Sequence, residues 1–266
     1  MQRAGRVRLE KTASHVNTQI MQELSVPHRL GRFVRSLRLF DAAEPSDAPE
    51  RYRRLPDGET ELLVRFDGRK TSAAVVGTRT GVFEKLADAP GGTLLVRFRA
   101  AGAYPFFGRA QSQLTDQYVL LSELWPLERR AQLEAADGAD AVVRATLATM
   151  QAALRRADAY DPWSARAARR AVRLIAEAPV LPRIPQLAAT LGVSERQLRR
   201  GFDHAIGLSP KQYLRVVRFR RALRAARSAA RPDWAAIAEL TGYFDQAHLI
   251  GEFRELSGVT PSALVG

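Results

Sequence analysis

The chain has 266 residues, of which 46% are hydrophobic, and 41 Lys+Arg against 28 Asp+Glu give it a formal net charge of +13. This length suffices for two domains with separate cores, and the basic balance favours an anionic partner such as nucleic acid. The absence of cysteine excludes disulfides, thiolate metal sites and a cysteine nucleophile.

Residues 1–26 show no clear hydrophobic period, and we expect this segment to be mobile. Its first twenty residues are polar and lack the apolar core of a signal peptide. No apolar run of the chain approaches the ~18 residues that span a membrane. We therefore expect a cytoplasmic protein.

From Pro27 onward the pattern is that of strands separated by turns. Apolar side chains recur at every second position in two stretches: Leu62, Val64, Phe66 and Leu94, Val96, Phe98. This alternation is typical of half-buried strands. Turn signals stand at Pro56-Asp57-Gly58, Asp67-Gly68 and Pro90-Gly91-Gly92. We interpret residues 27–160 as an α+β, mainly β regulatory domain, a small barrel-like or cupin-like sensor that ends in a helical linker.

The aromatic residues of this domain are candidate walls of a ligand pocket, although an ordinary core is the favoured interpretation. They are Phe66, Phe98, Tyr104, Phe106, Phe107 and Trp125. Arg65, Arg97 and Arg99 lie on the opposite strand face, where exposure to water is favoured over binding of an acidic effector. Neither a metal-ligand spacing nor a phosphate-binding loop nor a nucleophile motif is visible. We therefore expect no catalytic residue, no metal and no cofactor.

Helical periodicity begins near Ala139. An amphipathic stretch contains Val143, Leu147, Met150 and Leu154. Asp161-Pro162 interrupts it, and we place the boundary of a second domain, residues 161–266, at this point. Seven helices are expected in that domain: Ser164–Ala178, Pro185–Leu191, Ser194–Ala205, Pro210–Ala226, Asp233–Leu240, Asp245–Leu256 and Pro261–Val265.

The last third of the chain contains one pattern twice. The first copy has Ala188, Gly192, Leu198, Phe202 and Gly207; the second has Ala238, Gly242, Leu249, Phe253 and Gly258. The small alanine lets two helices approach closely, and the glycine accepts the positive φ of a turn. The Leu and Phe, four residues apart, lie on one face of the second helix and anchor it. The sequence therefore predicts two helix-turn-helix units in tandem.

These motifs resemble the DNA-binding domain of the AraC/XylS family of bacterial transcription regulators. The match runs from Ile184 to Ala263, and the stretch "IAELTGYFDQAHLIGEFRELSGVTPSALV" follows the family's signature spacing. The resemblance implies an all-α domain of two helix-turn-helix subdomains joined by a long helix, each with a recognition helix in the major groove. "LPDGETELLVRF" and "GGTLLVRFRAAGAYPFFGRAQSQLTDQYVLLSELW" resemble a poorly characterised N-terminal domain often found on such regulators.

The resemblance also implies which residues contact DNA. In the first recognition helix they are Arg196, Arg199 and Arg200; in the second they are Gln246, Ala247, His248 and Ile250. The second helix departs from the family, because Gly251 replaces a residue that is usually basic or polar. Glu252 follows it and would place an anion near the DNA phosphates. We therefore expect the second unit to dock more weakly than the first.

From these features we expect a sequence-specific transcriptional regulator, controlled by a small molecule or by self-association through its N-terminal domain. Its partners would be operator or promoter DNA, RNA polymerase, a small-molecule effector and a second copy of the chain. We expect no association with a membrane. One alternative is a partner-binding regulator with weakened DNA affinity. Another is an enzyme domain fused to a DNA-targeting module, but DNA-repair proteins with such modules rely on cysteines that this chain lacks.

Overall fold

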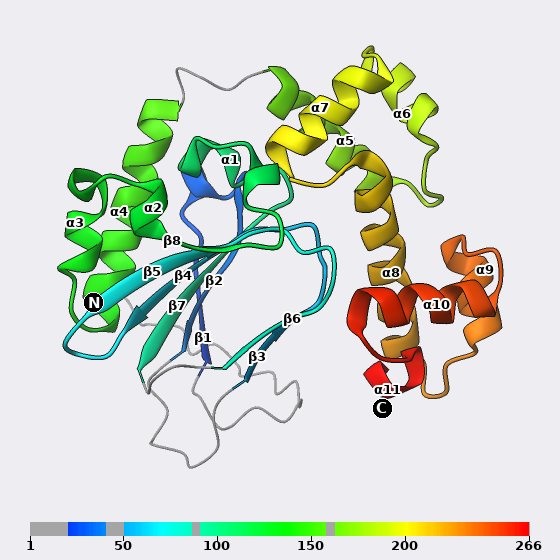
Figure 1. Cartoon of the computed structure of the whole chain (residues 1–266), viewed down its shortest axis with the longest axis horizontal. Helices are drawn as coiled ribbons and strands as arrows, with labels where there is room; N and C mark the ends of the chain where they lie inside the picture. Colours follow the sequence, from blue (N-terminus) through cyan, green and yellow to red (C-terminus); the bar gives the residue numbers. More distant parts are fainter. Residues whose placement is uncertain (1–20, 41–50, 87–90, 158–162, 266) are drawn as a thin grey trace, which may run out of the picture.

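A computed structural model describes residues 21–40, 51–86, 91–157 and 163–265 (Figure 1). An antiparallel sheet of six strands in the order β1-β2-β7-β4-β5-β8 forms the N-terminal domain. Its strands are β1 (Met21–Leu24), β2 (Val34–Phe40), β4 (Glu61–Phe66), β5 (Thr71–Val76), β7 (Gly92–Phe98) and β8 (Tyr118–Leu120). Two further strands, β3 (Arg51–Arg54) and β6 (Phe83–Leu86), form a separate antiparallel pair.

The two alternating stretches of the sequence are the neighbouring strands β4 and β7, which confirms them as strands. Leu62 lies opposite Val96, and Val64 lies opposite Leu94. Within the described ranges β1 and β8 each pair with one strand, so the sheet is open rather than closed into a barrel. The sheet also begins inside segment 1–26, because β1 pairs with β2 from Met21 onward; residues 1–20 lie outside the described part.

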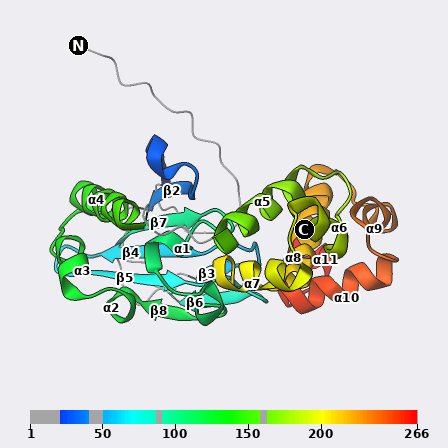
Figure 2. The ribbon, with the colours of Figure 1, turned by 90° about the horizontal axis from the view of Figure 1, so that it is seen from above.

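Helices cover one face of this sheet and complete its core (Figure 2). The N-terminal domain contains η1 (His28–Leu30), α1 (Tyr104–Phe107), η2 (Gln111–Gln113), α2 (Leu121–Leu124), α3 (Leu127–Glu134) and α4 (Ala139–Ala157). Val142 and Met150 of α4 are buried in the same cluster as Val64 and Val96 of the sheet. The amphipathic stretch read from the sequence is therefore a helix that packs on the sheet.

The candidate pocket aromatics fill the interior of the protein instead of lining a cavity. The Phe98 ring centroid lies 5.0 Å from that of Phe106 and 5.6 Å from that of Phe107, which lies 5.9 Å from that of Trp125. All four side chains are buried. Tyr104 is also buried, but it belongs to a second cluster that is shared with the C-terminal region.

The C-terminal region is entirely helical among its described residues. It contains α5 (Trp163–Glu177), α6 (Ile184–Leu191), α7 (Glu195–Ala205), α8 (Pro210–Ser228), α9 (Trp234–Thr241), α10 (Gln246–Ser257) and α11 (Pro261–Val265). Each helix begins and ends within two residues of its predicted bounds. The long helix α8 joins the pair α6–α7 to the pair α9–α10 (Figure 1). The predicted boundary at Asp161 falls in 158–162, outside the described residues.

Candidate nucleic-acid interface

The first helix-turn-helix unit is formed by α6 and α7, and its residues take the positions that their spacing predicts. Gly192 ends α6 in the left-handed region, with φ 67°. Ala188 is buried where the helices meet, and Leu198 and Phe202 of α7 are fully buried. The spacing of small residue, glycine and apolar pair therefore did predict this local fold.

A reciprocal cap fixes the start of α7. The backbone N–H of Gln197 donates to Ser194 Oγ at 3.2 Å, and the Ser194 N–H donates to Gln197 Oε1 at 2.9 Å. Such a capping box satisfies two backbone donors that the helix leaves unpaired. It holds the first turn of the helix, which carries Arg196, in a defined orientation.

The three arginines of α7 are exposed, on faces of the helix other than the one that Leu198 and Phe202 bury. Within the described part of the chain the side chains of Arg196, Arg199 and Arg200 form neither an ion pair nor a hydrogen bond. The helix itself is seated tightly, because a Cβ at Gly201 would stand 2.8 Å from the Ser164 carbonyl oxygen of α5. The result is three unpaired guanidinium groups on a rigidly placed helix.

The second unit, α9 and α10, repeats this geometry. Gly242 ends α9 with φ 79°, and Leu249 and Phe253 are fully buried. Asp245 caps α10 through its Oδ1, which accepts from the His248 N–H at 2.7 Å. The repeat read from the sequence is thus a structural repeat.

The four predicted contact residues of α10 differ in exposure. Gln246, Ala247 and His248 are exposed, whereas Ile250 is half-buried and packs against the core of the second unit. Neighbours hold the His248 ring: it lies edge-on to Tyr243 at 5.3 Å, and its Nδ1 accepts from the Phe244 N–H at 3.4 Å. The structure therefore presents three of the four side chains to solvent.

Glu252 lies in a place that the sequence did not predict. We expected it to put an anion beside the DNA phosphates, but its side chain is only 12% exposed and its Oε1 pairs with Arg215 Nε of α8 at 2.9 Å. Arg215 also pairs with Glu255, and the hydrogen bond from this guanidinium lowers the pKa of Glu255. A pairing between residues so far apart in the chain leaves no mark in local periodicity, so only the folded chain reveals it.

The N-terminal domain contacts the C-terminal ends of both α7 and α10. Thr78 Oγ1 donates to the Ile206 carbonyl at 2.6 Å, and Thr115 Oγ1 donates to the Gly207 carbonyl at 2.7 Å, just after α7. At the end of α10, Arg53 Nη2 donates to the Ser257 carbonyl at 3.0 Å. None of these contacts was predicted from the sequence.

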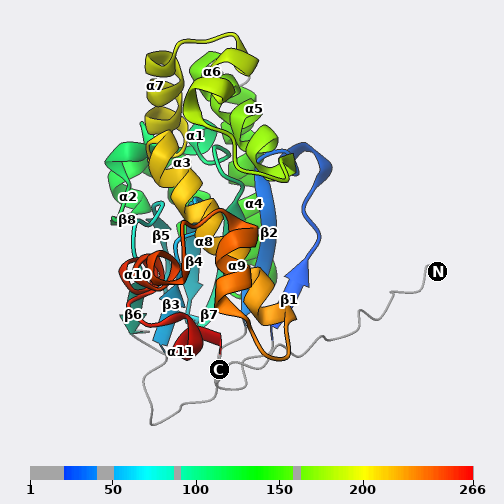
Figure 3. The same ribbon diagram turned by 90° about the vertical axis from the view of Figure 1, so that its right-hand side faces the viewer.

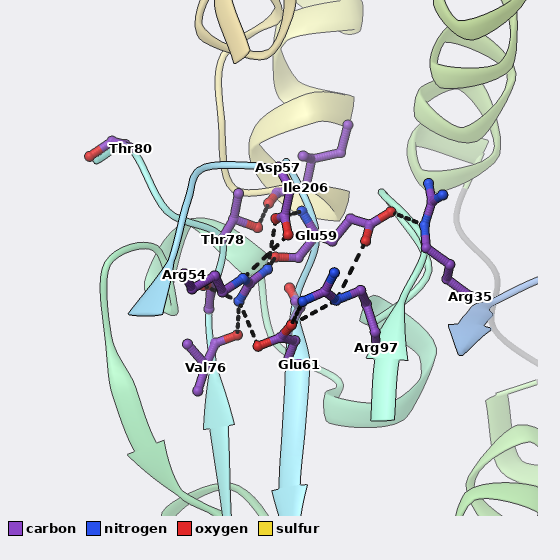
Figure 4. Close-up of polar contacts among 12 residues, drawn as sticks. Arg35, Arg54, Asp57, Glu59, Glu61, Val76, Thr78, Thr80, Arg97 and Ile206 are labelled. Atoms are coloured by element: carbon purple, nitrogen blue, oxygen red, sulfur yellow. Dashed lines mark hydrogen bonds and ion pairs between the residues drawn. The ribbon is translucent and has the colours of Figure 1, made fainter. Parts of the chain in front are cut away.

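A cluster of charged residues, buried except for the exposed Arg35, lies at this junction (Figure 4). We call it the charge cluster: Arg35, Arg54, Asp57, Glu59, Glu61 and Arg97. Arg54 pairs with Asp57 at 2.8 Å and with Glu61 at 3.5 Å. Arg97 Nε donates to Glu61 at 2.7 Å. Arg97, for which exposure to water was favoured, is therefore mostly buried in an ion-pair network.

Burial shifts the protonation of the charge cluster. Desolvation, with the negative charge of Asp57, raises the pKa of Glu59 to about 7, against the opposing effects of Arg35 and Arg97. Burial alone would raise the pKa of Asp57 too, but the charge and hydrogen bond of Arg54 bring it below its usual value. Tyr213 of α8 faces these carboxylates, and burial and the charge of Glu59 raise its pKa. The charge cluster therefore places Glu59, a carboxyl that titrates near neutral pH, beside Tyr213 of α8.

None of the helices in the described segments is both long and apolar enough to cross a membrane. No group of three or more His, Asp or Glu side chains among the residues of these segments is arranged to hold a metal ion.

Family models match both parts of the chain. A family described as "Helix-turn-helix domain" matches residues 187–265, and one described as "Domain of unknown function (DUF6597)" matches residues 22–120. The "Probable thc operon regulatory protein" of Rhodococcus erythropolis is 31% identical over 84 residues, which cover 30% of this chain and 24% of that protein. The chain thus spans about a quarter of that relative.

Two solved structures are similar to the chain. A transcriptional regulator with an AraC-type DNA-binding domain from Chromobacterium violaceum is 27% identical, with a TM-score of 0.36, over 40% of this chain and 94% of its own. ToxT from Vibrio cholerae is 9% identical, with a TM-score of 0.45, over 87% of this chain and 98% of its own.

Proposed function

We propose that this chain, an AraC-type transcription regulator with an N-terminal domain of the DUF6597 family, recognises operator DNA mainly through α7. The fused-enzyme alternative is less favoured, because the DNA-repair proteins that suggested it rely on cysteines that this chain lacks. On this proposal, residues up to about 160 form a regulatory domain and residues from about 161 form a DNA-binding domain.

The observation that carries the proposal is the set of unpaired arginines on α7. Arg196, Arg199 and Arg200 are exposed on a helix that is capped at Ser194 and seated against α5 at Gly201. Guanidinium groups donate two parallel hydrogen bonds to guanine or to phosphate. A rigid helix that presents three of them supports both direct reading of bases and backbone contacts that fix register.

Single alanine variants at these positions test the assignment on an operator identified by mapping genomic binding sites. If Arg200 reads a base, R200A weakens specific binding by about 1–3 kcal/mol. If it contacts phosphate alone, binding to all sequences falls alike and the salt dependence becomes shallower. Arg144 of α4 is exposed and distant in sequence from α7, so R144A is the matched control. Unchanged affinity in all three α7 variants would exclude α7 as the recognition helix.

The two units would contribute unequally to specificity. α7 presents three arginines, whereas α10 presents Gln246, Ala247 and His248 and continues with the exposed Gly251. Base-by-base substitution of the operator should therefore show one strict half and one tolerant half. Equal strictness in both halves would contradict the inequality.

The same proposal assigns control to the N-terminal domain, through a small molecule or through self-association. Its support is that Thr78, Thr115 and Arg53 contact the ends of both recognition helices. An effector changes DNA affinity only by its differential affinity for two conformations, typically ~1–3 kcal/mol. RNA polymerase and a second copy of the chain remain the other partners that we propose.

The alternative with weakened DNA affinity rested on Gly251 and Glu252. The support from Glu252 is reduced because Arg215 neutralises this carboxylate, whereas Gly251 is exposed as that alternative requires. The slope of log Kobs against log salt separates the two functions. A regulator that neutralises several phosphates shows a steep slope, whereas one that acts through protein partners shows weak, unspecific DNA binding.

A further inference from the structure

A hollow of about 930 Å³ lies between the connection from β1 to β2 and the C-terminal half of α4. The residues that line it are Val26, His28, Arg29, Gly31, Arg32, Gln151, Leu154 and Arg155. Three guanidinium groups and an imidazole therefore surround this space, and no carboxylate is among its lining residues. Arg29 and Arg155 make no ion pair within the described part of the chain.

The backbone that carries these groups is fixed rather than loose. η1 closes with hydrogen bonds from the Leu30 and Gly31 N–H groups to the Pro27 carbonyl, at 2.8 and 3.2 Å. Leu30 is fully buried below it, and Arg99 Nε donates to the Gly31 carbonyl at 2.9 Å. On the other wall, Gln151 and Arg155 are four residues apart in α4 and share one face of the helix.

The charged side chains that line the hollow indicate which class of ligand it can bind. Arg29 and Arg155 carry like charges without an ion-pair partner among the described residues, and an anion that binds between them relieves their repulsion. Guanidinium groups bind carboxylates and phosphates with two parallel hydrogen bonds. Val26 and Leu154 are the apolar side chains of the lining, and the aliphatic stems of the arginines and of Gln151 add further apolar surface. The guanidinium groups give the hollow its charge, so we expect a compact ligand that carries several negative charges.

DNA does not account for this cluster of charges. Figures 2 and 3 both place the connection between β1 and β2 on the side of the molecule opposite α7 and α10. DNA bound by the two recognition helices would therefore lie on the other side. This position favours a small diffusible ligand over a phosphate of the operator.

We propose that this hollow is the effector site of the regulator and that it binds a small polyanion, either a phosphorylated metabolite or a polycarboxylate. The proposal rests on the proposed function and names its effector class. A side-chain stack connects the hollow to the C-terminal region: the guanidinium carbons of Arg32 and of Arg169 in α5 lie 4.5 and 5.8 Å from the centroid of the Phe33 ring. α5 in turn packs against α7 at Gly201.

The test is calorimetric titration of the full chain, without DNA, with sodium pyrophosphate and separately with trisodium citrate at constant ionic strength. We expect one site per chain, and at least tenfold weaker binding by the double variant R29Q/R155Q. The control R144Q/R173Q removes two exposed arginines that do not line the hollow and should bind as the wild type does. Binding of pyrophosphate alone identifies a phosphorylated ligand, and binding of citrate alone a polycarboxylate.

Three results would overturn the proposal: binding of neither probe, equal weakening in both double variants, or complete competition by operator DNA. The last would make the hollow part of the DNA interface, whereas one pyrophosphate or citrate bound per chain in the DNA complex agrees with a separate site. A chain that binds a polyanion but no DNA would refute the proposed function and leave the anion site standing, so the two failures are distinguishable.

Discussion

Gly58 lies directly against the ring of Tyr213, and a Cβ at position 58 would stand 2.5 Å from Tyr213 Cε2. Gly58 is the glycine of a turn in the N-terminal domain, with φ 75°, and Tyr213 belongs to the helix that joins the two helix-turn-helix units. Tyr213 is itself held, because it is buried and packs edge-on against Phe202 at 5.6 Å. One turn of the N-terminal domain thus packs directly against α8.

Substitution G58A should therefore destabilise the chain more than an ordinary turn substitution does. A left-handed φ costs an alanine about 1–2 kcal/mol, and overpacking against Tyr213 adds about 1–3 kcal/mol. Gly68 is the matched control, since its φ is 81° and a Cβ at this position would meet nothing within 4 Å. Urea unfolding of G58A and G68A measures the loss in free energy of unfolding of each variant. Equal losses would show that the contact with Tyr213 does not add to the cost of G58A.

Substitution E59Q should stabilise the chain increasingly as pH rises. Burial raises the pKa of Glu59 from 4.5 to about 7, so the stability that protonated Glu59 contributes is complete below pH 4.5 and is lost as pH rises through 7. Glutamine does not ionise, so the free energy of unfolding of E59Q should exceed that of the wild type by up to about 3 kcal/mol at pH 8. Unfolding free energies of both proteins between pH 5 and 8 check this; a constant difference would contradict it.

Substitution G251R should raise DNA affinity. Position 251 is exposed and nothing lies within 4 Å of a Cβ built there, so a side chain fits without a clash. G251A is the control, because it recovers about 1 kcal/mol of helix stability without adding a charge. If the introduced guanidinium contacts a phosphate, the slope of log Kobs against log salt should steepen by about 1 in G251R and stay constant in G251A. Equal slopes would place position 251 off the DNA.

Arg215 should be coupled more strongly to Glu252 than to Glu255. Both carboxylates pair with it, but the side chain of Glu252 is 12% exposed and that of Glu255 is 66% exposed. Exposed ion pairs contribute about 0–1 kcal/mol, whereas a buried charge that loses its partner costs about 1–3 kcal/mol. Double-mutant cycles of R215M with E252Q and with E255Q measure both couplings; the reverse order would contradict the assignment.

Local sequence patterns predicted the helices of the C-terminal region well, because each helix cap and each helix end depends on residues only a few positions apart. Ser194 and Gln197, three residues apart, form a helix cap. Gly192 and Gly242 end their helices because each adopts a left-handed φ. Likewise the alternation in β4 and β7 predicted two strands, though not that they are neighbours or that the sheet stays open.

What the sequence could not show are relationships between distant segments. Arg97 reads as an outward strand residue, yet Glu61 on the neighbouring strand pairs with it. Pro56-Asp57-Gly58 reads as a turn and nothing more, yet its glycine meets a tyrosine of the other domain, Tyr213. The arginines around the hollow come from two segments far apart in the chain, so no spacing rule gathers them.

Three of the hydrogen bonds between the N-terminal domain and the C-terminal region use main-chain carbonyls as acceptors, at Ile206, Gly207 and Ser257. A carbonyl is present whatever side chain the residue carries, so these contacts tolerate drift in the sequence of the DNA-reading part. The exception is Gly207, where a Cβ would stand 2.5 Å from Thr115 Oγ1. Other contacts of the same junction do depend on side chains, among them Gly58 against the Tyr213 ring. Substitutions in the C-terminal region should therefore be tolerated best at the positions that contribute only a carbonyl to the junction.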